Sequence, residues 1–191
     1  HAVGASGFAF RKRADGGYTI ANRGASTAYI TPDSFRLFFD FLPALVKQRE
    51  EIRLRVGRMF IDEARLARRW RMDERTPFEQ IRILDPEPDQ KVMAEGLANL
   101  RKAFPAFANA RIAQSWGGLI DATPDAVPVI GEVPRLPGFF IASGFSGHGF
   151  GIGPGAGRLT ADLVTGAPPL VDPKPYRLDR FERLRRTTAA A

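Results

Sequence analysis

The segment with the clearest chemical potential is a glycine-rich stretch, GFSGHGFGIGPGAG, at residues 144–157. Seven of its fourteen residues are glycine. The apolar run before it, residues 138–143, predicts a buried strand, and residues 158–164 after it predict a helix. A turn of this kind lets backbone N–H groups approach an anionic or electron-rich ligand, and the helix N-terminus adds a partial positive charge. The sequence therefore predicts a ligand site at this turn.

Within this stretch, residues 151–156 match the dinucleotide pattern G-x-G-x-x-A. That pattern requires its first glycine directly after the strand, and an acidic residue of a second strand about 20 positions further on. Here several residues intervene, and a proline-rich segment around Val171 and Asp172 follows. We therefore expect no adenosine half of a dinucleotide here. We favour a helix N-terminus whose N–H groups, from Gly147 to Gly153, face the negative N1 and O2 atoms of a reduced flavin.

His148 is the candidate catalytic residue, because it is the only histidine besides His1. Its imidazole could carry a proton or lie beside a bound ring system. A structural histidine that bonds to the backbone is the alternative, and the sequence leaves both open. The chain has no cysteine, which excludes disulfides, thiolate catalysis and zinc–sulfur sites, and we predict no metal site.

The composition sets limits on the class of protein. The 191 residues, 44% hydrophobic and 26% charged, suit one large soluble domain or parts of two. No apolar run approaches the roughly 20 residues that span a bilayer, and no signal peptide is visible, so we expect no membrane span and a cytoplasmic location. The net charge of +7 would suit nucleic acid, but the densest basic run, residues 65–75, carries its own acids at Asp73 and Glu74. We interpret this run as a solvated helix face and expect no nucleic-acid partner.

Turn and capping signals place the remaining elements. Segments 8–13 and 18–23 flank Asp15-Gly16-Gly17 and predict a hairpin. Thr31 and Pro32 predict the start of a helix that Pro43 should kink. The other elements expected are a strand at 51–56, helices at 62–70 and 89–104, strands at 109–120 and 127–131, and an extended basic tail at 167–191 with a disordered end from residue 187.

Four motifs occur in a specific order: LDPEPD at 84–89, WGGLIDATPD at 116–125, PVIG at 128–131, and the glycine-rich stretch. Together they resemble the C-terminal half of FAD-dependent amine and amino-acid oxidoreductases of the D-amino-acid oxidase superfamily, which includes glycine oxidase, sarcosine oxidase and D-amino-acid dehydrogenase. The resemblance covers most of the chain, weakly before Leu84 and strongly from Trp116 to Val171. Each motif alone has little specificity, whereas the combination at this spacing is specific.

The resemblance implies a mixed α+β fold. Residues 1–115 look like a portion of an antiparallel-sheet substrate domain, and residues 116–166 look like the C-terminal strand–helix part of an FAD-binding domain. The family's N-terminal G-x-G-x-x-G βαβ unit, which binds the ADP moiety, is missing from the sequence. Together with a start at His1 in place of Met, this predicts a fragment that lacks most FAD affinity and all turnover on its own. Its expected partner is the N-terminal half of the FAD domain.

The resemblance also implies which residues lie near the cofactor. In the family, the backbone matching residues 147–151 contacts the pyrimidine side of the isoalloxazine, and the segment matching 116–118 passes near the ring. The expected cofactor-binding residues are therefore Trp116, Gly117, Gly118, Gly147, His148, Gly149, Phe150, Gly151, Ile152 and Gly153.

Three family positions differ in this sequence. Sarcosine oxidase-like members attach flavin through a Cys that falls at Gly118, so FAD is expected to be bound non-covalently. An Arg or Tyr that anchors the substrate carboxylate in several members falls at Ile120, and a Lys of sarcosine oxidases falls at Gly151. Gly118 and Ile120 are the expected substrate-pocket residues, and the usual carboxylate clamp is not visible.

The leading hypothesis is therefore part of an FAD-dependent oxidase or dehydrogenase that oxidises a C–N bond of an amine or amino acid to an imine by hydride transfer to flavin. Apolar surface near residues 139–143 would be covered by the missing half or by a homodimer. The competing hypothesis is a non-enzymatic basic module that binds a nucleotide, a polyanion or a partner protein. Salt-sensitive nucleic-acid binding would favour this second hypothesis, and bound flavin would favour the first.

Overall fold

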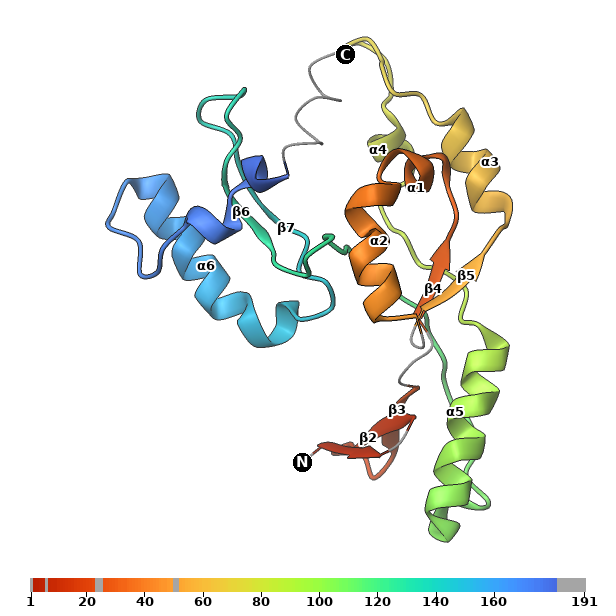
Figure 1. Ribbon diagram of the computed structural model, residues 1–191. Helices are drawn as coiled ribbons and strands as arrows, with labels where there is room; N and C mark the ends of the chain where they lie inside the picture. Colours follow the sequence, from red (N-terminus) through yellow and green to blue (C-terminus); the bar gives the residue numbers. More distant parts are fainter. Residues whose placement is uncertain (1, 6, 23–25, 50–51, 182–191) are drawn as a thin grey trace. The chain divides into compact units, whose positions relative to one another are not determined.

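The computed structural model describes residues 2–5, 7–22, 26–49 and 52–181 (Figure 1). The strands are β1 Ala2–Ala5, β2 Phe8–Lys12, β3 Tyr18–Asn22, β4 Ser26–Tyr29, β5 Ile52–Arg55, β6 Val129–Glu132 and β7 Phe140–Ser143. The α-helices are α1 Pro32–Arg36, α2 Phe38–Lys47, α3 Arg58–Arg65, α4 Pro77–Gln80, α5 Gln90–Ala103 and α6 Gly149–Thr165. Three short 3-10 helices are η1 Pro105–Phe107, η2 Lys174–Tyr176 and η3 Leu178–Arg180.

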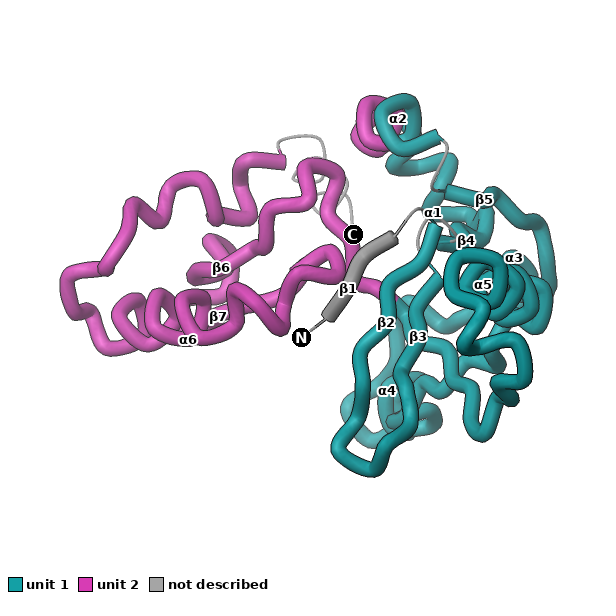
Figure 2. Tube along the Cα trace, turned by 90° about the horizontal axis from the view of Figure 1, so that it is seen from below, with its two compact units in different colours: residues 1–38, 45–119 teal, residues 39–44, 120–191 magenta. Residues whose placement is uncertain are grey.

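These elements form a mixed α+β fold with small sheets, which confirms the predicted fold class. β1, β2 and β3 form an antiparallel sheet, β4 and β5 pair in parallel, and β6 and β7 form an antiparallel hairpin. By its contacts the chain divides into unit 1, residues 1–38 and 45–119, and unit 2, residues 39–44 and 120–191 (Figure 2). The domain boundaries expected from the sequence, at 115/116 and 166/167, stay predictions.

The predicted hairpin of unit 1 is confirmed as β2 and β3. Gly16 takes the left-handed conformation with φ of 86°, and the Arg13 amide donates to the Gly17 carbonyl at 2.8 Å, which closes the turn. The inner face of the hairpin carries aromatic rings that pack against the end of α5 and against η1. The ring centroids of Phe10 and Phe104 lie 5.2 Å apart, within the range of favourable edge-to-face packing.

Helix α5 lies where the sequence places it. The Asp89 carboxylate accepts the amides of Lys91 at 2.9 Å and Val92 at 3.3 Å, a side-chain N-cap that fixes the first turn. Leu100 is fully buried against the hairpin core that includes Phe8. The local cap and the buried face therefore agree on the same helix.

Three elements predicted between residues 31 and 120 differ from the structure. The helix from Thr31 is two helices, because the chain leaves helical geometry at Leu37, and Pro43 lies inside the second one. The helix predicted at 62–70 is α3, which begins after Gly57 and ends before Leu66 turns extended. The strand predicted at 109–120 is absent from that described segment, which has no strand partner there and links unit 1 to unit 2.

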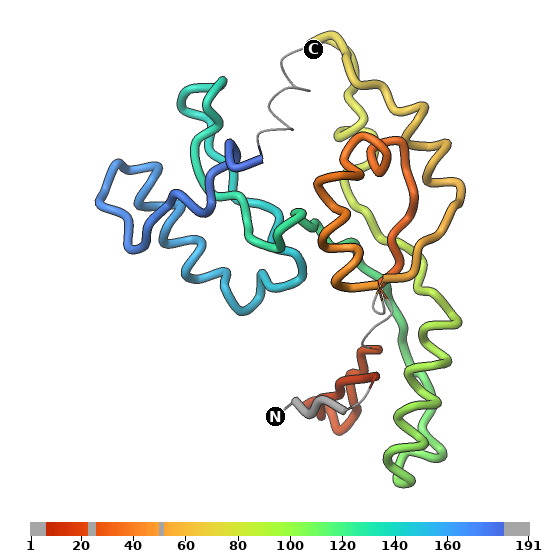
Figure 3. Tube along the Cα trace, in the orientation of Figure 1, coloured from red at the N-terminus to blue at the C-terminus, as the bar shows by residue number. Residues whose placement is uncertain are grey.

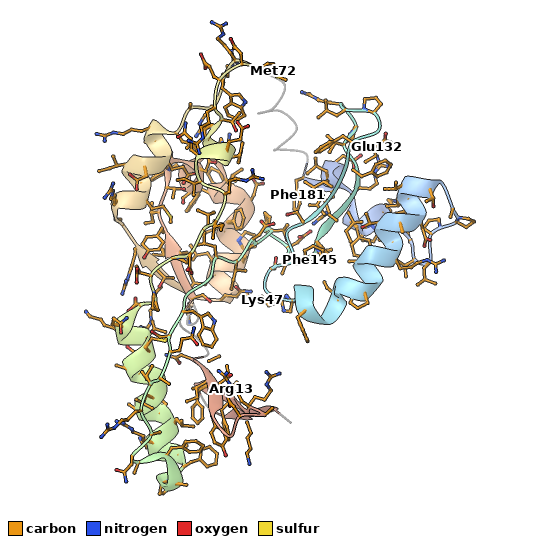
Figure 4. The ribbon with its side chains drawn as sticks, turned by 180° about the vertical axis from the view of Figure 1, so that it is seen from behind. Arg13, Lys47, Met72, Glu132, Phe145 and Phe181 are labelled. Atoms are coloured by element: carbon orange, nitrogen blue, oxygen red, sulfur yellow. The ribbon has the colours of Figure 1, made fainter. Side chains whose placement is uncertain are left out.

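The core of unit 2 forms where α6 packs against the β6–β7 hairpin. Ile130, Ala156 and Leu159 are buried together, and Phe145, Leu163 and Tyr176 pack against them. Figure 4 shows Phe145 in the connection between β7 and α6. The strands predicted at 127–131 and 138–143 are confirmed as β6 and β7, joined in register from Val129 opposite Ser143. β7 is partly exposed, whereas a buried strand was predicted.

Helix α6 begins nine residues earlier than predicted, at Gly149 in place of Arg158. Most of the glycine-rich stretch is therefore helical, because Ala156 and Leu159 gain a buried face that outweighs the low helix propensity of glycine. The helix ends at Gly166, whose φ of 71° is left-handed, and the Ala167 amide donates to the Asp162 carbonyl at 2.9 Å.

The chain after α6, residues 167–181, runs back along β6, as Figure 3 shows. We call this segment the strap. The described part of the predicted extended tail contains η2 and η3, so it is more ordered than expected. The predicted disordered end from residue 187 lies outside the described residues. Among the residues that the structure describes, no helix has both the length and the apolar character needed to cross a membrane.

Candidate functional site

The turn between β7 and α6 has a backbone conformation that its residue types allow. Gly144, Ser146 and Gly147 have left-handed φ values of 74°, 51° and 82°. Glycine adopts such values without a steric penalty, whereas a serine there carries strain. At Gly144 there is also no space for a side chain, because a Cβ would lie 2.4 Å from Thr123 Cγ2.

The turn leads directly into the N-terminus of α6. The His148 amide donates to the Phe145 carbonyl at 2.8 Å, and the His148 carbonyl accepts the amides of Gly151 at 3.0 Å and Ile152 at 3.2 Å. Within the described part of the chain, the amides of Gly149 and Phe150 have no backbone partner. The predicted approach of the N–H groups from Gly147 to Gly153 to flavin stays a prediction, in which the Gly151 and Ile152 amides are already engaged within the helix.

The electrostatics of this helix end favour a negative group. No acidic side chain lies in the first turn of α6, so nothing in that turn offsets the positive end of the helix dipole. The Phe150 side chain is fully exposed, and Ile152 and Ile120 are partly exposed. Amide donors beside exposed apolar side chains suit a ligand that is flat, apolar and negatively charged at one edge.

The segment 120–123 lies directly behind the turn. The Ser146 amide donates to the Asp121 carbonyl at 2.8 Å, and the Asp121 carboxylate accepts the Gly144 amide at 2.7 Å and the Ser143 hydroxyl. Ile120 contacts the same turn, since its Cδ1 lies 3.8 Å from where a Gly147 Cβ would be. The structure thus brings the predicted pocket residue Ile120 beside the predicted cofactor-binding residue Gly147.

Residues 123–127, which follow this segment, are held by contacts with the strap. The Arg180 guanidinium donates to the Asp125 carboxylate, with Nε 2.8 Å from Oδ2, and to the Val127 carbonyl. Burial alone would raise the pKa of Asp125, but hydrogen bonds from Arg180 and the Val127 amide, together with the Arg180 charge, lower this pKa below its ordinary value. The strap therefore fastens the 123–127 turn, which in turn lies behind the glycine turn.

The remaining predicted site residues, Trp116, Gly117 and Gly118, belong to unit 1, whereas Ile120 and residues 147–153 belong to unit 2. Trp116 is 54% exposed, so its indole is open to a ligand. Gly117 has a structural role within unit 1, because a Cβ there would lie 2.7 Å from the Pro86 carbonyl oxygen. This contact joins two of the sequence motifs, LDPEPD and WGGLIDATPD.

The two neighbouring glycines offer a matched test of this packing. Gly117→Ala should lower the free energy of unfolding by about 1–3 kcal/mol, because the Pro86 backbone cannot move aside cheaply. Gly118→Ala should change it by less than about 0.5 kcal/mol, since no atom lies within 4 Å of the added methyl. Urea denaturation of both variants measures the difference. Equal effects would contradict the close approach to Pro86.

His148 occupies the N-cap position of α6 and is exposed, and its side chain makes no capping hydrogen bond. Its predicted catalytic role stays a prediction, as does the assignment of the other site residues to cofactor or substrate. The described residues contain no group of three or more His, Cys, Asp and Glu side chains that could hold a metal ion.

Sequence reasoning missed the residues that hold the turn from behind, namely Asp121, Thr123, Ser146 and Arg180. A signal was nevertheless available, because a serine directly before Gly147 in a glycine-rich strand-to-helix turn is a candidate for a left-handed residue that needs a stabilising side-chain contact.

Comparison with known sequences gives one family and several relatives. The sequence model of the family described as FAD dependent oxidoreductase matches residues 15–163. Glycine oxidase from Pseudomonas aeruginosa is 32% identical over 92 residues, which are 48% of this chain and 25% of that protein. Sarcosine oxidase subunit beta from Arthrobacter is 34% identical over 91 residues, 48% of this chain and 22% of that protein. The aligned part is thus about a quarter of these relatives.

Comparison with solved structures extends the likeness to nearly the whole chain. The L-amino acid deaminase from Proteus myxofaciens, solved in complex with anthranilate, is 35% identical with a TM-score of 0.85. The match covers 92% of this chain and 39% of the deaminase. The chain therefore corresponds to about two fifths of that structure.

Proposed function

The chain belongs to the FAD-dependent oxidoreductase family, and from this premise we propose that it forms the flavin-ring end of an enzyme that oxidises a C–N bond of an amine or amino acid. The relatives named above include oxidases and a deaminase of amino acids and amines. The proposal carries the reaction class from these proteins to this chain, and it leaves oxidase and dehydrogenase activity equally open.

The observation that carries the proposal is the turn from Gly147 to Phe150. Its amides at Gly149 and Phe150 point out of the start of α6, beside Gly147, which lacks a side chain, and beside the apolar Ile120. These features fit the pyrimidine edge of an isoalloxazine, which is flat and becomes negatively charged on reduction. FAD held there would supply the hydride acceptor for oxidation of the carbon next to the substrate nitrogen.

The residues of this chain would then bind and orient the flavin and the substrate, and they need not take part in covalent steps. Amides at the start of α6 stabilise negative charge at the flavin edge without reorganising, because they are fixed by the helix. Gly118 and Ile120 are proposed as substrate-pocket residues, and Trp116 is proposed as a cofactor-binding residue. With no cysteine in the sequence, the attachment of FAD is proposed to be non-covalent. His148, exposed at the same helix end, is proposed to accept or relay a proton.

The substrate is proposed to be a small amine or amino acid. Ile120 cannot bind a carboxylate, so any carboxylate contact would come from other residues. The N-terminal ADP-binding unit of the family is the proposed partner, and the isolated chain is proposed to be inactive. Exposed apolar side chains of unit 2, including Phe139 and Phe150, are available for that partner or for a second copy of the chain.

Flavin binding tests the proposal directly. The chain is produced alone and together with a polypeptide that carries the family's G-x-G-x-x-G βαβ unit. We expect a yellow complex only in the second case, with FAD that denaturant releases. FAD affinity of the chain alone should be at least about a hundredfold weaker, as expected when two or more charge-assisted hydrogen bonds are lost. No flavin in either preparation, together with tight and salt-sensitive binding of nucleic acid, would favour a basic binding module.

A further inference from the structure

A pair of hydroxyl groups lies behind the turn and has no role in the function proposed above. Thr123 and Ser146 are 23 positions apart in sequence, yet the Thr123 amide donates to Ser146 Oγ at 3.1 Å and the two hydroxyl oxygens lie 3.3 Å apart. We propose that Thr123 and Ser146 are positioning residues, which hold residues 147–150 so that the Gly149 and Phe150 amides face the flavin. The flavin part of this inference rests on the proposed function.

The contacts show which groups of this pair donate and which accept. The Thr123 hydroxyl donates to the Val127 carbonyl at 2.9 Å, which uses its only proton. The Ser146 hydroxyl then donates either to the Gly144 carbonyl at 3.2 Å or to Thr123 Oγ1, and Ser146 Oγ accepts the Thr123 amide. Ser146 is thus tied to Thr123 by an acceptor role that no alanine or glycine could replace.

The backbone at Ser146 explains why the turn needs this tie. Its φ of 51° is left-handed, a conformation that an L-residue adopts only when its surroundings hold it there. The Ser146 amide is also bound, by the Asp121 carbonyl. Both the amide and the hydroxyl of Ser146 are therefore fastened to segment 121–123, and the next residues of the chain are those that expose the amide donors.

The same contacts reach further through the fold. Thr123 is linked by its hydroxyl to Val127, and the Val127 carbonyl also accepts from Arg180. The position of the flavin-facing amides therefore depends on a series of hydrogen bonds that begins at Ser146 and ends in the strap after α6. We infer that loss of the hydroxyl pair loosens the turn while the α6–hairpin core stays folded.

Variants of Thr123 and Ser146 test the inference by two readouts, in the full chain and in its FAD-loaded complex with the ADP-binding unit. Thr123→Val removes the hydroxyl at constant shape, Thr123→Ser keeps it, and Ser146→Ala removes the other hydroxyl while a side chain stays at the left-handed position. Thr160→Val is the matched control, because Thr160 also donates to a carbonyl at 2.8 Å but within the body of α6.

The first readout is hydrogen exchange of the two hydrogen-bonded amides of the turn, at residues 146 and 148, in the full chain without FAD. Loss of about 1 kcal/mol of hydrogen bonding predicts exchange about fivefold faster in Thr123→Val and Ser146→Ala. Thr123→Ser and Thr160→Val should exchange like the unaltered chain. Unchanged exchange in Thr123→Val and Ser146→Ala would overturn the positioning role, whether or not the chain binds flavin.

The second readout is the dissociation constant and the reduction potential of FAD in the complex. Thr123→Val and Ser146→Ala should weaken FAD binding about fivefold and lower the potential, because reduced flavin loses amide donors. Thr123→Ser should restore both values. Faster exchange with unchanged affinity and potential would show that the turn does not face flavin and would overturn the inference. A complex that binds no FAD at all would count against the proposed function, while the exchange data would still decide the role of the pair.

Discussion

Replacement of Gly144 by alanine is expected to destabilise unit 2 by about 2–5 kcal/mol. Two costs add at this position. A left-handed φ of 74° costs an L-residue about 1–2 kcal/mol, and the new methyl would lie 2.4 Å from Thr123 Cγ2, an overlap worth about 1–3 kcal/mol. Urea denaturation, followed by far-ultraviolet circular dichroism, measures the change in the free energy of unfolding. The substitution also displaces Thr123, so FAD binding should weaken together with stability.

Two companion variants separate these costs. Gly138→Ala meets a left-handed φ of 82° but no atom within 4 Å, so it should show the conformational cost alone. Thr123→Ser removes the overlapping methyl and keeps the hydroxyl, so it should recover part of the stability of Gly144→Ala, a coupling that a double-mutant cycle measures. If Thr123→Ser gives no recovery, the contact between Thr123 and residue 144 is not the source of the loss.

The elements predicted correctly from sequence have their cause in a few adjacent residues. Asp15-Gly16-Gly17 contains the left-handed glycine of the hairpin turn, and Asp89 supplies the side-chain cap of α5. Such signals act within four residues and need no knowledge of the rest of the chain. They were therefore visible without a structure.

The errors arise where tertiary contacts decide. Residues 109–120 were predicted as a strand, but a strand also needs a neighbour, and this segment connects two units instead. The early start of α6 was missed because glycine favours turns, whereas burial of Ala156 and Leu159 on Ile130 extends the helix back to Gly149.

The residues of the candidate site differ in how far the sequence reveals them. The glycine turn is a local pattern, but residues 147–150 lie at the helix start only because α6 begins earlier than predicted. The hydroxyl pair and the ion pair behind it join residues 23 and 55 positions apart, which no local pattern reveals. The ligand site at this turn stays a prediction, and the structure shows how the turn is held.

The bond between Arg180 and Asp125 should contribute measurably to the stability of unit 2. Arg180 makes two contacts to the carboxylate and one to the Val127 carbonyl, and its side chain is only 16% exposed, against 40% for Asp125. Arg180→Gln should lower the free energy of unfolding by about 1–3 kcal/mol, at the lower end if solvent screens the exposed carboxylate. Arg177→Gln is the control, because Arg177 pairs locally with Asp179 and is more exposed, so its replacement should cost less than that of Arg180.

The pH dependence of the stability lost in Arg180→Gln shows whether the ion pair causes that loss. The pKa of Asp125 is lowered in the folded chain, so the carboxylate stabilises the fold fully above its unfolded pKa of about 3.9. This stabilisation is lost as the pH falls through the folded pKa, which lies below that value. The stability gap between the unaltered chain and Arg180→Gln should therefore be constant from pH 7 to 5 and shrink below about pH 4. A gap that persists unchanged at pH 3 in urea titrations would mean that the Val127 contact and packing, and not the ion pair, hold the strap in place.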